Sequence, residues 1–113
     1  MKTLMLTMKA FMLALALLVS LSPAAFARCN AYDEVYLFEQ PRCLPCMAVK
    51  RLLAEHGIRY ESRDARIPQN AWYMQTHAGT SGTPVVTIGN RRDGYRHVAG
   101  YNVPLLRAYL CLR

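Results

Sequence analysis

Short apolar runs alternate with helix-like periodicities in the chain after residue 34. Residues 35–38 are a continuous apolar run of strand length, and residues 44–56 carry apolar side chains at helical spacing until Gly57 ends the pattern. Ile58 to Ser62 alternates apolar and polar positions, which predicts a second strand. Because a helix joins these two strands, we expect them to lie parallel in one sheet.

The second half of the chain continues the alternation, and its proline and glycine residues mark the expected boundaries. The predicted order is β-α-β-α-β-β-α, with no internal repeat and no second domain. The remaining elements are a helix that begins at Pro68 and ends at residues 77–79, strands over residues 85–88 and 95–99, a hairpin loop from Gly89 to Gly94, and a helix over residues 103–112 with Pro104 in its first turn.

The first quarter of the chain has a different pattern. Two lysines precede a largely apolar stretch over residues 10–21, and small residues follow up to Ala27. This order is typical of a secretory signal peptide with an Ala-x-Ala cleavage site. The alternative is a retained membrane anchor, which needs about 20 apolar residues and is disfavoured by the short run. We therefore expect cleavage after Ala27 and one periplasmic or secreted domain over residues 28–113.

Charge narrows the classes of partner. The chain has 14 Lys and Arg against 7 Asp and Glu, and removal of Lys2 and Lys9 leaves the mature domain at a net charge of +5. The arginines are spread along the chain without interleaved aromatic residues, so we expect no nucleic-acid partner. Either a solvated basic face or steering towards an acidic partner or an anionic thiol accounts for the charge.

Cys43-Leu44-Pro45-Cys46 opens a predicted helix directly after a predicted strand. A thiol at a helix N-terminus faces unpaired backbone N–H groups and the positive end of the helix dipole, which favour the thiolate. Cys43 is therefore the expected nucleophile, with Arg42 as an adjacent positive charge, and Cys46 is the expected resolving thiol. A zinc knuckle would need a second close pair of ligands, which the chain lacks, and copper binding with Met47 rests on composition alone.

Three features together resemble the glutaredoxin branch of the thioredoxin superfamily. They are the Cys-x-x-Cys motif after a buried strand, Thr83-Pro84 before a valine-rich strand, and Gly100 at the turn before the last helix. The resemblance covers residues 33–112. It implies an α/β, thioredoxin-like (glutaredoxin) fold with a four-stranded mixed sheet, and it implies that Pro84 is in the cis form beside the cysteines.

The resemblance also implies a substrate site. Glutathione-binding members use a basic residue near the first cysteine, the backbone before the cis proline, and a glycine with a glycine or acidic partner before the last helix. Arg42 or Gln40 matches the first role, Thr83 the second, and Gly100-Tyr101 stands at the third. This turn lacks the acidic pair and is closer to that of carriers that depend on thioredoxin reductase, so the use of glutathione stays open.

Cys29 and Cys111 are the remaining cysteines. In the implied fold, Cys29 precedes the first strand and Cys111 ends the last helix, so both lie on the side opposite Cys43. Of the three ways to pair four cysteines, only Cys29 with Cys111 avoids bridging opposite ends of the domain. We predict a structural disulfide there, with two unpaired thiols as the alternative.

These observations predict a periplasmic thiol-disulfide oxidoreductase. We expect a monomer without metal or cofactor whose partners are protein disulfides or a membrane or periplasmic thiol reductase, with glutathione as a candidate co-substrate. The alternative is a redox-inactive or metal- or partner-binding module that retains the thioredoxin fold. The direction of electron flow does not follow from the motif, because related dithiols span roughly −270 to −120 mV.

Overall fold

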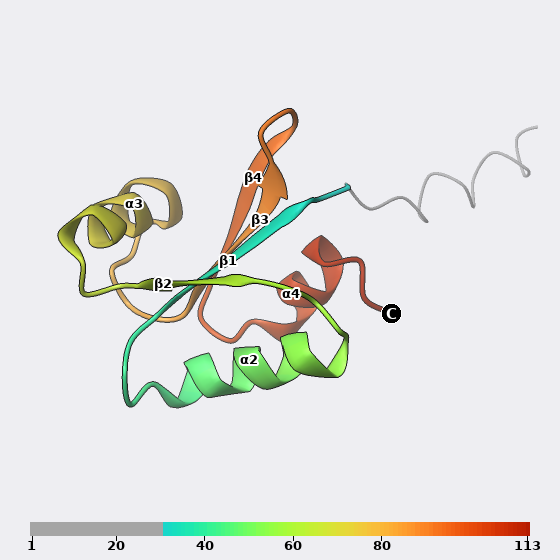
Figure 1. Ribbon diagram of the computed structural model, residues 1–113, viewed down its shortest axis with the longest axis horizontal. Coiled ribbons are helices and arrows are strands. Elements are labelled where there is room, and N and C mark those ends of the chain that lie inside the picture. The colour runs from blue at the N-terminus through green and yellow to red at the C-terminus, as the bar shows by residue number, and fades with distance from the viewer. Residues whose placement is uncertain (1–30) are drawn as a thin grey trace, which may run out of the picture.

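The computed structural model describes residues 31–113, so the predicted signal peptide, its cleavage site and Cys29 lie outside the described residues. The described elements follow one another in the predicted order (Figure 1). No helix in residues 31–113 combines the length and the apolar character that a membrane span requires. The elements are β1 (Glu34–Glu39), α2 (Leu44–Glu55), β2 (Glu61–Asp64), α3 (Pro68–Ala78), β3 (Val85–Asn90), β4 (Gly94–Ala99) and α4 (Val103–Tyr109).

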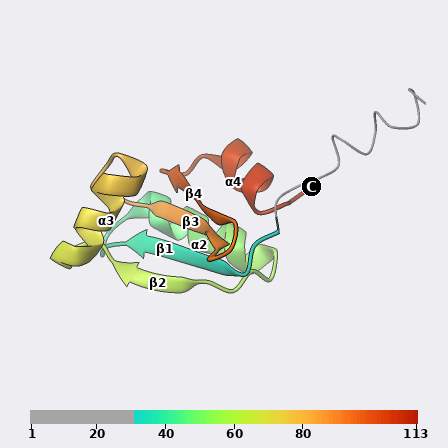
Figure 2. The same cartoon turned by 90° about the horizontal axis from the view of Figure 1, so that it is seen from above.

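The strands form one mixed sheet in the order β2-β1-β3-β4, which Figure 2 shows from above. β1 pairs in parallel with β2 and antiparallel with β3, and β3 pairs antiparallel with β4. The parallel pairing of the first two strands confirms the prediction. A helix between consecutive strands provides the length of chain that a parallel crossover requires.

Helices cover both faces of this sheet. Alternation along β1 sends Val35 and Leu37 into the larger core cluster, which they share with side chains of α2 and α4. Phe38 points to the opposite face, where it packs in a smaller cluster around Met74 of α3. Figure 1 accordingly shows α3 on one side of the sheet and α2 with α4 on the other.

The second strand begins at Glu61, three residues later than the Ile58 start that the sequence predicted. The reason lies at the end of α2, where Gly57 has φ +63° and donates to the carbonyl of Ala54 at 3.1 Å. Ile58 donates to the carbonyl of Leu53 at 2.9 Å and packs against the larger core cluster. This is a Schellman cap with its usual apolar contact, so Ile58 serves the helix end instead of the sheet.

The last helix ends at Tyr109, earlier than the predicted Leu112. Cys111 has φ +60° and donates to the carbonyl of Ala108 at 3.4 Å, while Leu112 donates to the carbonyl of Arg107 at 2.8 Å. These two bonds form a second Schellman-type cap. A non-glycine residue in the left-handed region is uncommon, which is why the sequence pattern did not indicate the stop.

The hairpin loop is also shorter than the predicted Gly89–Gly94. β3 extends to Asn90 and β4 starts at Gly94, which leaves residues 91–93 as the turn. Gly89 pairs with Tyr95 inside the sheet, and a Cβ on Gly89 would lie 2.1 Å from the carbonyl oxygen of Gly94. Glycine at position 89 therefore permits the close approach of the two strands that this tight turn requires.

Candidate redox site

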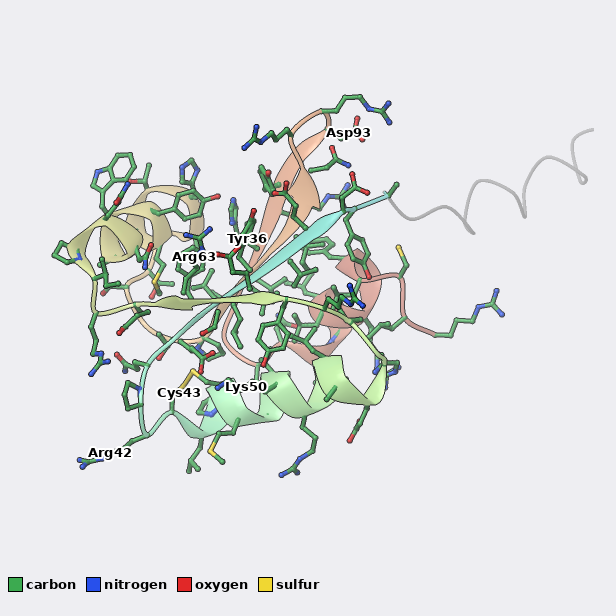
Figure 3. All side chains as sticks on the ribbon, viewed as in Figure 1. Tyr36, Arg42, Cys43, Lys50, Arg63 and Asp93 are labelled. Atoms are coloured by element: carbon green, nitrogen blue, oxygen red, sulfur yellow. A yellow bond between two sulfur atoms is a disulfide. The ribbon has the colours of Figure 1, made fainter. Side chains whose placement is uncertain are left out.

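Cys43 and Cys46 form a disulfide at the N-terminus of α2 (Figure 3). Cys43 is the N-cap residue, and its sulfur accepts a hydrogen bond from the backbone N–H of Cys46 at 3.1 Å. Cys43 is 8% exposed and Cys46 only 2%, so an incoming sulfur reaches Cys43 more easily. The N-terminal N–H groups and the helix dipole at this position also favour a thiolate on Cys43.

The loop before β3 lies against the first of these sulfurs. The Thr83-Pro84 peptide bond is cis, as the family resemblance implied. The hydroxyl of Thr83 donates to the sulfur of Cys43 at 3.4 Å, and the backbone N–H of Gly100 donates to the carbonyl of Pro84 at 2.8 Å. The fold therefore brings the Thr83-Pro84 segment against Cys43 and bonds Gly100, from a second segment, to Pro84.

Arg42 and Tyr101 flank this arrangement at the surface. Arg42 has φ +60°, and its exposed guanidinium points away from the sulfurs of the disulfide (Figure 3). The charge that the sequence placed beside Cys43 thus faces solvent in this conformation. Tyr101 follows Gly100 directly and is also exposed.

A cavity of about 320 Å³ opens on the side of the disulfide that faces β2, and its lining includes both cysteines, Glu39 and Lys50. The Glu39 carboxylate pairs with the ammonium of Lys50 and accepts a hydrogen bond from the hydroxyl of Ser62 at 2.6 Å. The bond to Glu39 raises the pKa of Lys50. The side chain of Glu39 is mostly buried, which is unusual for a carboxylate and is tolerated because both partners compensate its charge.

Sequence reasoning missed this polar group. The apolar run predicted a first strand that ends at residue 38, before Glu39, and nothing in the pattern indicated a role for Lys50 or Ser62. The structure brings them together because β1 extends to Glu39 and lies parallel to β2, with Leu37 opposite Ser62 and Glu39 opposite Asp64. The glutamate directly after a buried apolar strand was the available signal for a functional carboxylate. The strand register that brings Lys50 and Ser62 to it cannot be determined from the local sequence pattern.

No histidine is among the residues that line this cavity. The rings of His77 and His97 are 5.6 Å apart between centroids, beside Tyr73 on the α3 side of the sheet. Burial and then the neighbouring His77 lower the pKa of His97, whose ring nitrogen Nδ1 lies 2.9 Å from the hydroxyl of Thr87. Within residues 31–113, no three Cys, His, Asp or Glu side chains are arranged to hold a metal ion.

The predicted second disulfide involves one cysteine outside the described residues, so the Cys29–Cys111 pairing stays a prediction. Cys111 follows α4 near the C-terminus. Figures 1 and 2 both place this end of the chain on the side of the molecule away from the start of α2. Cys111 therefore lies at the end of the domain remote from Cys43, as we expected of this cysteine.

Comparison with known proteins places the chain in a family. One similar solved structure is a mutant of the thioredoxin-like protein BC3987, with 28% sequence identity and a TM-score of 0.58, and the match covers 72% of this chain and 99% of that one. The unmutated BC3987 matches with 29% identity and a TM-score of 0.53, over 66% of this chain and 96% of that one. The glutaredoxin grx-1 from Archaeoglobus fulgidus has the same fold at 22% sequence identity, with a TM-score of 0.59 over 68% of this chain and 85% of that one. No curated protein sequence matches the chain.

The glutaredoxin family model matches residues 35–92, which include β1, the cysteine pair and β3. That match spans just over half of the chain, and together with the Cys43–Cys46 pair it supports a thiol oxidoreductase-like role. The chain belongs to the glutaredoxin family.

Proposed function

We propose that this protein is a thiol-disulfide oxidoreductase that exchanges electrons with disulfides through Cys43 and Cys46. The observation that carries the proposal is the position of the Cys43 sulfur, which caps α2 and contacts Thr83 beside the cis Pro84. This position combines a stabilised thiolate with a surface on which a second sulfur can approach. Membership of the glutaredoxin family supports the same chemistry.

The exchange takes two displacement steps. In the reduced protein the Cys43 thiolate attacks one sulfur of a partner disulfide, which forms a mixed disulfide and releases the other partner sulfur as a thiolate. Cys46 then loses its proton and attacks the Cys43 sulfur. The Cys43–Cys46 bond forms, the second partner sulfur leaves as a thiolate, and two electrons have passed from protein to partner. The reverse sequence reduces the protein at the expense of a partner dithiol.

We place this activity outside the cytoplasm, because residues 1–27 have the pattern of a cleaved export signal. Partners there are protein disulfides and a membrane or periplasmic thiol reductase, and glutathione is a further candidate. The net charge of the mature domain favours encounter with acidic partners.

Two cysteine variants test the proposal. Cys43→Ser should abolish reduction of a synthetic peptide disulfide, because the attacking thiolate is lost. Cys46→Ser should still attack but stop at the mixed disulfide, which mass spectrometry detects as a covalent adduct with the peptide. Reduction retained by Cys43→Ser would refute the assignment of the nucleophile. The measured reduction potential of the Cys43–Cys46 couple, compared with that of a candidate partner, then gives the direction of electron flow between the two.

A further inference from the structure

Helix α3 meets strand β4 through a group of three rings. The centroids of Tyr73 and His77 on α3 lie 4.3 Å apart, and the ring of His97 on β4 lies 5.8 Å from Tyr73 and 5.6 Å from His77. We call these three residues the ring seam. Met74 is the one fully buried side chain of α3. Because the helix buries so little else, its attachment to β4 is sensitive to any change in the seam.

The ring of His97 is held on the sheet by a polar partner. Its Nδ1 lies 2.9 Å from the hydroxyl of Thr87, a residue that is 1% exposed. If the ring turned out to reach water, it would break this bond and leave the buried hydroxyl without its partner, which is costly. A positive charge on His97 would therefore stay partly buried as long as α3 covers the ring.

A positive charge on the seam has no carboxylate partner among residues 31–113. Helix α3, strand β3 and residues 79–84 between them contain no Asp, Glu, Lys or Arg. On β4, Arg96 lies over the ring of Tyr109, on the opposite face of the sheet from His97. The other titratable groups on the α3 face are bonded to one another, Glu34 with Tyr36 and Tyr95, and Glu61 with Arg63.

These surroundings set the sign of the pH dependence. Burial and then His77 lower the pKa of His97 from its ordinary value of 6.5, so the ring binds a proton more readily when α3 is detached than when it is seated. The contribution of the seam is complete above a pH of about 6.5 and falls as the pH drops below that value. It levels off once the pH is below the lowered pKa of the seated ring.

We infer that the ring seam is a pH-sensitive clasp, which holds α3 and the Thr83 segment in place near neutral pH and releases them in mild acid. After α3, Gly79 turns the chain with φ +71°, and residues 80–82 lead to Thr83. The hydroxyl of Thr83 donates to the sulfur of Cys43 at 3.4 Å. A donor at this sulfur favours the thiolate, so release of the clasp slows the attack by Cys43. This regulation goes beyond the proposed function.

Amide hydrogen exchange of the oxidised protein tests the clasp element by element. In the wild type, protection of α3 relative to α2 should fall several-fold as the pH is lowered from about 7.5 to about 5.5, across the titration of histidine. His97→Gln retains a hydrogen-bonding side chain but cannot become charged, so this ratio should stay constant. His77→Gln should weaken the effect, because one of the two like charges is gone. His56→Gln is the matched control, since His56 is exposed at the end of α2, and it should behave as the wild type does.

The rate of disulfide exchange tests the link to the redox site. Wild type and His97→Gln should reduce a peptide disulfide at equal rates at the higher pH, and the variant should be several-fold faster at the lower pH. The ratio of the two rates cancels the titration of Cys43 itself. Equal rates at both pH values would overturn the link to Cys43.

A constant ratio of α3 to α2 protection in the wild type would overturn the clasp, and this measurement needs neither a variant nor an activity. A fall in that ratio which persists in His97→Gln would overturn it as well, because the seam would not be its cause. Absence of disulfide exchange at either pH would defeat the proposed function, while the hydrogen-exchange result would still decide whether α3 is released.

Discussion

Glu39 is the residue whose role changes most between sequence and structure. Its carboxylate lines the same cavity as Cys46, whose thiol is almost fully buried and must lose a proton before it can attack. Lys50 and Ser62 hold the carboxylate in place. The cavity has room for several water molecules, so we expect Glu39 to accept this proton through a short chain of water.

Replacement of Glu39 by glutamine should therefore slow the second displacement step. General acid-base catalysis contributes about 100-fold or more, so we expect a loss of roughly this size at neutral pH. The rate of release of the second partner thiol in a single turnover measures it, with the first step as internal reference. Glu61→Gln is the matched control, because its side chain lies on the opposite face of β2 from Ser62. Equal second-step rates in wild type and Glu39→Gln would remove Glu39 from the mechanism.

At the scale of the elements, the pattern of apolar positions predicted the type and order of the described elements, and all of them except β2 contribute side chains to one of the two core clusters. The incorrect predictions concern the residues at which elements begin or end. Ile58 looked like part of a strand but completes the cap of α2, and Cys111 stops α4 in a conformation that its identity does not suggest. Ends depend on hydrogen bonds and on strand register, which local patterns do not encode.

The connection between β2 and α3 provides a pH-dependent test. Asp64 accepts hydrogen bonds from the backbone N–H and the guanidinium of Arg66, which lower its pKa to about 2. A depressed pKa means that the interaction stabilises the fold above the unfolded value of about 4 and is lost as the pH falls through 2. Urea unfolding should thus show Asp64→Asn to be less stable than wild type at pH 6, with the difference shrinking towards pH 2.

Arg66→Ala should reproduce the same pH dependence, because it removes the other partner of the interaction. The double variant should then be no less stable than the less stable single variant. A stability difference that stays constant from pH 6 to pH 2 would show that Asp64 acts through something other than its charge.

At the scale of the whole molecule, the arrangement of the sheet and helices separates the redox site from the end of the chain that carries Cys111. A disulfide between Cys29 and Cys111 would close a loop over nearly the whole domain, remote from the reacting sulfurs. In the chain-entropy model a loop of this length stabilises the fold by about 4 kcal/mol. A small domain has limited core to hold it together, so this contribution matters.

Mass spectrometry of peptides from unreduced protein should find Cys29 joined to Cys111 and Cys43 joined to Cys46. The Cys29→Ser variant should unfold at a lower urea concentration by an amount equivalent to about 4 kcal/mol. Its rate of disulfide exchange under folding conditions should match that of the wild type, because the redox pair is untouched. Peptides in which Cys29 or Cys111 is joined to Cys43 or Cys46 would disprove the pairing.

The cap of α2 has a consequence for the protein as an electron carrier. The sulfur of Cys43 accepts the hydrogen bond that holds the first helical turn, so one atom serves both the helix and the redox couple. Any substitution that stabilises this turn more in one oxidation state than in the other shifts the midpoint potential, by about 30 mV for each 1.4 kcal/mol. The exposed side chain of Leu44 lies in that turn. The driving force of the protein can therefore be tuned from the helix, without changing either cysteine.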